Sequence, residues 1–170
     1  MKIKPEIQDA INDQVQAEMY SANLYLSMSC YFESINLSGF ANWMRVQWKE
    51  ETAHAVKFIN YLEERGGRAI IKKIDQPPSE FGTVLEVFQK VLEHEQYVTD
   101  RIHKLYELSL AENDYPLQSF LKWYIDEQVE EEANASEILE SVKMLGDSGY
   151  HIYMLDSRMK SREFDPAEYE

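Results

Sequence analysis

Six polar residues recur at matching positions in the two halves of the chain, and their types suit metal binding. In each half, a lone glutamate precedes a four-residue motif by the same interval, with Glu-x-x-His in the first half and Gln-x-x-Glu in the second. Residues three positions apart on a helix share a face, so the two polar side chains of each motif can bind the same ligand. The pattern therefore indicates a metal centre between two similar halves, with these candidate ligands: Glu18, Glu51 and His54, then Glu95, Gln128 and Glu131.

The composition narrows the class of protein. The 170 residues suit one domain with a substantial core, and 31 acidic against 17 basic residues give a formal charge of −14. Such a surface repels nucleic acid and anionic membranes and favours cations. The sequence has no secretory apolar region and no apolar run long enough to span a membrane, so we expect a soluble cytoplasmic protein.

The single cysteine limits the metal chemistry further. Cys30 has no cysteine partner, which excludes an internal disulfide and any cysteine-rich iron–sulfur site. We expect Cys30 to be buried and inert. Three histidines outside the motifs lack acidic partners at ligand spacing on a buried stripe, and we expect them at the surface: His94, His103 and His151.

Helical periodicity predicts the elements that carry the six residues. Apolar residues recur at steps of three and four over about 5–35, 39–65, 83–111 and 115–145, and a short helix is predicted at about 147–160. Ser38 is a candidate cap for the second helix. Short connections make two antiparallel hairpins, and the long connection at 68–82 can cross the length of the bundle. The predicted fold is all-α, an antiparallel four-helix bundle with one long crossover plus a short fifth helix, as a single domain over 1–170.

Each of the six polar residues interrupts an apolar stripe near the middle of its helix. A buried carboxylate is costly unless it is paired, and no lysine or arginine shares these stripes. The acids would repel one another unless cations held them together. Carboxylate-rich ligation with one imidazole favours iron or manganese over zinc.

The same residues divide into two metal subsites. Glu51 can use both oxygens to bridge two metals about 3.5–4 Å apart. Glu18 and His54 complete one subsite, and Glu95 and Glu131 belong to the other. Gln128 is a neutral, weak oxygen donor that we expect to hydrogen-bond a bound oxygen species or a carboxylate that does not itself bind the metal, so the second subsite should bind metal more weakly.

Over nearly its whole length the chain resembles the non-haem bacterial ferritins. The resemblance rests on residues 17–25 (AEMYSANLY), 50–55 (EETAHA), 94–96 (HEQ) and 120–132 (FLKWYIDEQVEEE). Gln128-x-x-Glu131 departs from the second Glu-x-x-His of other ferritin-like bundles and agrees with the ferritin branch. Bacterioferritin-like haem binding needs a methionine after the bridging glutamate, and Thr52 stands there, so we expect no haem.

The resemblance implies a ferroxidase and iron store. Two Fe²⁺ would be oxidised by O₂ or hydrogen peroxide at the diiron centre, and Fe³⁺ would pass to a mineral inside a homo-oligomeric shell of 24 subunits. It also implies a third iron site at Glu50, Glu127 and Glu130, with Glu131 shared. Tyr25 matches a tyrosine near the diiron centre, where it could donate an electron or hydrogen-bond a ligand; the alternative is a core aromatic.

Two other functions stay open from the sequence. A diiron oxidase or peroxidase would use the same centre without a storage shell. A metal-free bundle would use its buried acids only to specify packing.

Overall fold

The computed structural model describes residues 3–146 and 148–169, and all regular structure among these residues is helical. This confirms the all-α class. A helix lies at each of the five predicted positions; Asp147, at the predicted start of the fifth, lies outside the described residues. The elements are α1 (Pro5–Ser34), α2 (Ser38–Glu64), α3 (Val84–Ala111), α4 (Tyr115–Leu145), α5 (Gly149–Met159) and a 3₁₀ helix, η1 (Pro166–Tyr169).

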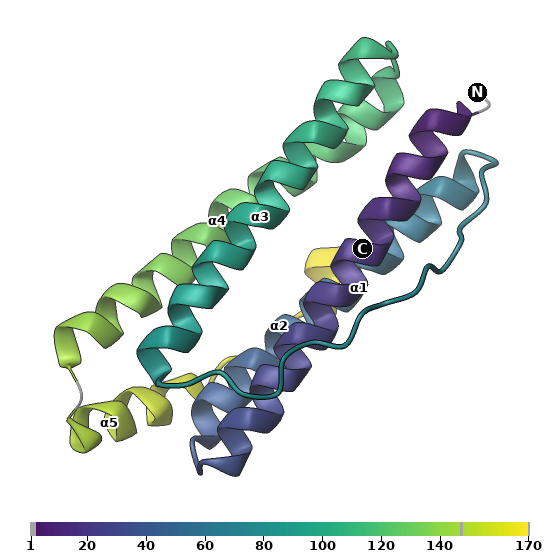
Figure 1. Ribbon diagram of the computed structural model, residues 1–170. Helices are drawn as coiled ribbons and strands as arrows, with labels where there is room; N and C mark the ends of the chain where they lie inside the picture. Colours follow the sequence, from purple (N-terminus) through teal and green to yellow (C-terminus); the bar gives the residue numbers. More distant parts are fainter. Residues whose placement is uncertain (1–2, 147, 170) are drawn as a thin grey trace. The chain divides into compact units, whose positions relative to one another are not determined.

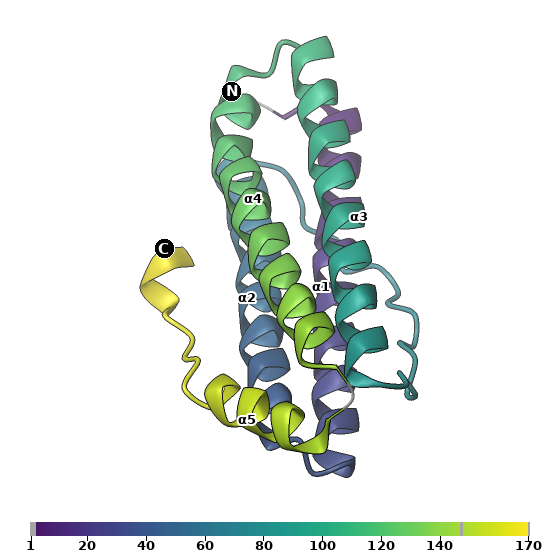
Figure 2. The same cartoon turned by 90° about the vertical axis from the view of Figure 1, so that its left-hand side faces the viewer.

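The chain divides into two compact units. The first unit comprises Met1–Phe81 and Leu145–Glu170, and thus α1, α2, α5 and η1; the second, Gly82–Met144, holds α3 and nearly all of α4. Figures 1 and 2 show both units. That 1–170 forms one domain stays a prediction.

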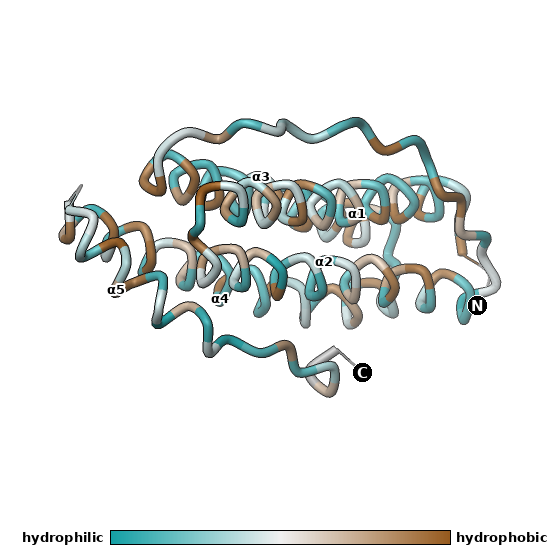
Figure 3. The backbone as a smooth tube through the Cα atoms, turned by 90° about the horizontal axis from the view of Figure 1, so that it is seen from below, coloured by the Kyte–Doolittle hydropathy of each residue, from teal (hydrophilic) through white to brown (hydrophobic). Residues whose placement is uncertain are grey.

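In the first unit, α1 and α2 lie side by side as an antiparallel hairpin (Figure 1). Asn36 closes the turn with a φ of 63°, in the left-handed region that asparagine tolerates. Phe32 and Phe40 stack across the hairpin with ring centroids 5.3 Å apart, and Ser29 Oγ donates a 2.8 Å hydrogen bond to the Ala41 carbonyl. Apolar residues recur along each helix instead of forming one continuous run, as Figure 3 shows. This pattern gives each helix one buried face.

The long connection between α2 and α3 runs along α1. Asn12 fixes its beginning, donating to the Arg68 carbonyl (3.1 Å) and accepting from the Ile70 amide (2.8 Å). Ser27 fixes its end by donating to the Pro78 carbonyl at 2.6 Å. Because Asn12 and Ser27 are four turns apart on α1, the connection covers much of the length of the hairpin. This is the course that the predicted crossover requires.

Helix α5 is attached to the start of α2 by a buried carboxylate. Asp156 Oδ1 accepts hydrogen bonds from the backbone amides of Gly39 (2.8 Å) and Phe40 (3.0 Å). A side chain at position 39 would place its Cβ 1.6 Å from the Asp156 carbonyl oxygen, so only glycine permits this approach. The prediction that Ser38 caps α2 is wrong: Ser38 is the first helical residue, and Asp156, distant in sequence, accepts from the amides there.

In the second unit, α3 and α4 form the other hairpin. Thr83 and Glu86 make a reciprocal capping box at the start of α3. Asp114 Oδ1 accepts from the Leu117 amide (3.0 Å) at the start of α4. Thr99 Oγ1 donates to Glu132 (2.6 Å) across the hairpin, which fixes the register of the two helices.

Two further observations concern the surface. Cys30 is exposed on α1, so the prediction that it is buried is wrong. Within the described residues, no helix combines the length and the apolar character needed to cross a membrane.

Candidate metal centre

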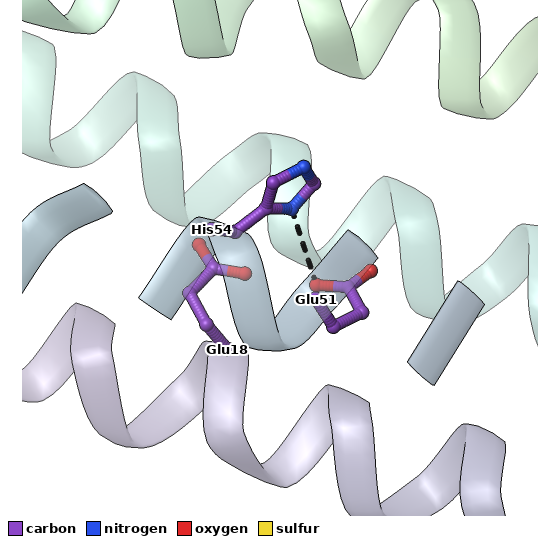
Figure 4. Close-up of side chains that lie close together, drawn as sticks. All are labelled: Glu18, Glu51 and His54. Carbon is purple, nitrogen blue, oxygen red and sulfur yellow. Dashed lines mark ion pairs between the residues drawn. The ribbon is translucent and has the colours of Figure 1, made fainter. Parts of the chain in front are cut away.

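Three of the predicted ligands come together in the first unit. Glu18 of α1 and Glu51 and His54 of α2 each offer a ligand atom, and these three atoms lie within 4.8 Å of one another (Figure 4). Each residue is only 1% exposed. Two carboxylates and an imidazole thus converge in a buried place, an arrangement that suits a divalent cation.

Helical spacing accounts for the pair on α2. Glu51 and His54 are three positions apart, and Nδ1 of His54 lies 3.4 Å from Oε2 of Glu51 (Figure 4). At this distance the two side chains can share a proton or a metal ion. The imidazole is a common ligand of iron, and the carboxylate is the hard donor that iron also accepts.

Glu18 provides the test of whether a cation fits. Its Oε1 accepts a 2.7 Å hydrogen bond from Nε2 of Gln14. Its Oε2 is buried and has no hydrogen-bond partner among the described residues. Leaving a buried polar atom unsatisfied costs roughly 1–3 kcal/mol, more for a charged group. A cation among the three side chains would satisfy this oxygen, so the residues fit the metal that the sequence predicted.

Gln14 is a site residue that the sequence reasoning missed. It is 2% exposed and holds one oxygen of Glu18, so it sets the orientation of that carboxylate. The available signal was its position, four residues before Glu18 and therefore on the same helix face.

The other three predicted ligands lie in the second unit, and all are buried. Nε2 of Gln128 lies 3.3 Å from Oε2 of Glu95, from the Glu95 carbonyl and from Oγ1 of Thr99. Gln128 therefore donates to Glu95, itself one of the predicted ligands, and a role of Gln128 at a metal site stays a prediction. Glu131 lies one turn after Gln128 on α4, and its side chain is 4% exposed. A bridging role for Glu51 between two irons stays a prediction.

The predicted third-site residues have varied surroundings. Glu50 is buried, and its Oε2 lies 2.7 Å from Nη2 of Arg162. Glu127 is half-buried and Glu130 is exposed. Their joint role as iron ligands stays a prediction.

Tyr25 and the histidines outside the motifs differ in how far they are buried. Tyr25 is fully buried, with its ring edge-to-face against Trp43 at 6.5 Å, and its part in iron chemistry stays a prediction. His94 is half-buried, so it lies only partly at the surface where the sequence placed it. Burial lowers the pKa of His94 to about 4, so the ring is neutral at pH 7. His103 and His151 are exposed, as expected.

Comparison with protein families supports the interpretation of the fold. A family model described as Ferritin-like domain matches residues 8–145. The bacterial non-heme ferritin of Bacteroides fragilis (strain 638R) is 47% identical over 160 residues, which cover 94% of this chain and 99% of that protein. The bacterial non-heme ferritin of Campylobacter jejuni is 38% identical over 159 residues, covering 94% and 95% of the two chains.

The solved structures that are similar to this chain are also ferritins. An open pore ferritin from the hyperthermophilic archaeon Archaeoglobus fulgidus has a TM-score of 0.95 and 46% identity, covering 96% of this chain and all of the other. A humanized archaeal ferritin has a TM-score of 0.96 and 47% identity, with 97% of this chain covered. The resemblance drawn from the sequence and the predicted four-helix bundle class are thereby confirmed.

Proposed function

The chain belongs to the ferritin family, whose members store iron, and from this premise we propose that it is a ferroxidase that oxidises Fe²⁺ and retains the product as an Fe³⁺ mineral. The observation that carries the proposal is the buried triad of Glu18, Glu51 and His54. Family membership supplies the substrate class. The triad supplies a place in this chain where that substrate can bind.

The triad acts by holding and orienting Fe²⁺. Glu18 and Glu51 offset the positive charge of the ion, and the His54 imidazole adds a donor of intermediate softness. Gln14 restrains one oxygen of Glu18, which fixes the direction of the other. The electron transfer to O₂ or hydrogen peroxide is supplied by the metal, and the protein contributes position and a dry environment.

We assign the second iron to Glu95, Gln128 and Glu131, with Glu51 as the bridging carboxylate. Gln128 donates to Glu95 and orients it. A neutral amide in place of a histidine weakens this subsite relative to the triad. Glu50, Glu127 and Glu130 are proposed ligands of a third iron, with Glu131 shared.

The storage part of the proposal is an assembly of 24 copies in the cytoplasm, with Fe³⁺ mineral inside. The support is family membership and the formal charge of −14, which draws Fe²⁺ toward acidic surfaces. Analytical ultracentrifugation separates this proposal from a diiron oxidase without storage. A sharp species of about 24 subunits supports the shell, and a monomer or dimer rules it out.

A thermal shift experiment tests the metal site. Anaerobic Fe²⁺ should raise the melting temperature of the protein with increasing concentration, because the ion binds the native state selectively. Glu51→Ala should lose most of this rise. Glu107→Ala, an exposed acid on α3, is the matched control and should keep it. An unchanged melting temperature of the wild type with Fe²⁺ would support the metal-free bundle instead.

A further inference from the structure

An arginine beyond α5 is paired with the acid that precedes the triad residue Glu51. Nη2 of Arg162 lies 2.7 Å from Oε2 of Glu50, and the two side chains are 22% and 9% exposed. Glu50 and Arg162 are far apart in sequence, so the contact depends on where residues 160–164, termed here the C-terminal segment, lie on α2. A charge-assisted hydrogen bond of this kind is among the stronger polar contacts in a protein.

Several other contacts hold this segment on α2. The Arg162 guanidinium stacks over the Trp43 ring, with Cζ 4.5 Å from the centroid. Nδ2 of Asn42 donates to the carbonyls of Met159 (3.1 Å) and Arg162 (3.0 Å). Lys49 Nζ lies 5.9 Å from the Phe164 ring centroid. The Arg162 guanidinium therefore packs on the Trp43 ring and pairs with the Glu50 carboxylate.

The Glu50 carboxylate that pairs with Arg162 is also a proposed metal ligand. Glu50 directly precedes Glu51 on α2, and it is one of the acids assigned above to a third iron. A cation that approaches Oε2 of Glu50 competes with Arg162 for the charge of this carboxylate, because Oε2 accepts a short, charge-assisted hydrogen bond from the guanidinium. A divalent cation beside an undisplaced guanidinium would also meet like-charge repulsion.

We propose that Arg162 is a tethered cation that occupies Glu50 until a divalent metal ion replaces it, so that metal binding at Glu50 releases the C-terminal segment. This inference rests on the proposed function, because it takes Glu50 as a ligand for Fe²⁺. Beyond that function, Arg162 competes with the metal ion for Glu50, and the C-terminal segment is released when the metal ion binds.

The competition has a direction that can be measured. A metal ion at Glu50 must either displace Arg162 or lie beside its positive charge, and both cost free energy, so the apparent affinity there is lower than the acids alone would give. Arg162→Gln keeps part of the aliphatic stem and a polar end, and it removes the positive charge. We expect it to raise the Fe²⁺ affinity of the proposed third site, which includes Glu50, about tenfold, the size of a typical charge-assisted contact.

Anaerobic calorimetric titration with Fe²⁺ alone tests the competition. Wild type, Arg162→Gln and the control Arg158→Gln are compared; Arg158 is an exposed arginine in the last turn of α5. The expected result is tighter Fe²⁺ binding at the proposed third site in Arg162→Gln only. Identical titration curves for all three proteins would overturn the inference.

Hydrogen exchange of residues 160–164 tests the release. Fe²⁺ should speed amide exchange there in the wild type, while Glu50→Gln should exchange fast without metal and respond no further. The variant His54→Ala separates the inference from the proposed function. It should lose Fe²⁺ binding at the triad but keep the faster amide exchange of residues 160–164 when Fe²⁺ is added. Fe²⁺ binding at the triad with unchanged exchange of the segment would overturn the inference alone. No Fe²⁺ binding to the wild type would overturn both.

Discussion

At Glu18, one carboxylate oxygen accepts a hydrogen bond from Gln14 and the other is buried without a hydrogen-bond partner among the described residues. The side chain is thus held in one orientation, and it offers a ligand atom within 4.8 Å of ligand atoms of Glu51 and His54. A carboxylate in this position is poorly suited to packing alone. It is well suited to a cation, which would satisfy the buried oxygen.

We predict that Gln14→Ala weakens Fe²⁺ binding at the triad about tenfold, because loss of a residue that orients a metal ligand commonly costs that much affinity. The measurement is anaerobic calorimetric titration. Gln89→Ala, an exposed glutamine on α3, is the control and should bind like the wild type. Unchanged affinity in Gln14→Ala would show that Glu18 needs no such support.

At the scale of elements, helix termini determine how the helices are attached. We predict that Asp156→Ala lowers the free energy of unfolding by about 1 kcal/mol, since two amides at the start of α2 lose their acceptor. Amide exchange at Gly39 and Phe40 should rise in the same variant. Asp100→Ala, an exposed acid on α3, should change neither. An Asp156→Ala protein with wild-type exchange at these amides would contradict the long-range cap.

The start of α3 gives a prediction about pH. Hydrogen bonds from the Thr83 amide and hydroxyl lower the pKa of Glu86 below 4.5, so the folded state favours the ionised form. The capping box therefore stabilises the protein above pH 4.5, and this stability is lost as the pH falls through the folded pKa. We expect Glu86→Gln to lower the melting temperature at neutral pH and to approach the wild type in acid. A pH-independent difference would contradict this.

The elements also show what the sequence could and could not predict. Helical periodicity fixes which residues share a face, so the positions of the helices and the convergence of Glu18 with Glu51 and His54 were predictable. Periodicity does not fix how much of a helix surface neighbouring segments cover, and Cys30 was therefore placed inside wrongly. The contacts of Asp156 and Arg162 depend on a segment that returns to α2 from far along the chain, and no local pattern encodes them.

At the scale of the whole molecule, one chain carries proposed iron ligands in both of its compact units. The triad lies in the first unit, and Glu95, Gln128 and Glu131 lie in the second. The proposal requires these two sets to act on a pair of irons. Family membership and the matching spacing of the two halves support it. The count of irons that react together is therefore the quantity that matters most.

Stopped-flow oxidation after anaerobic Fe²⁺ loading measures that count directly. Mixing with O₂ should give a fast phase whose amplitude saturates at about two Fe²⁺ per subunit, as expected for a paired metal site. Glu18→Ala and His54→Ala should slow this phase more than Glu130→Ala does. A fast phase that saturates at one Fe²⁺ per subunit, or equal initial rates in the three variants, would contradict the account.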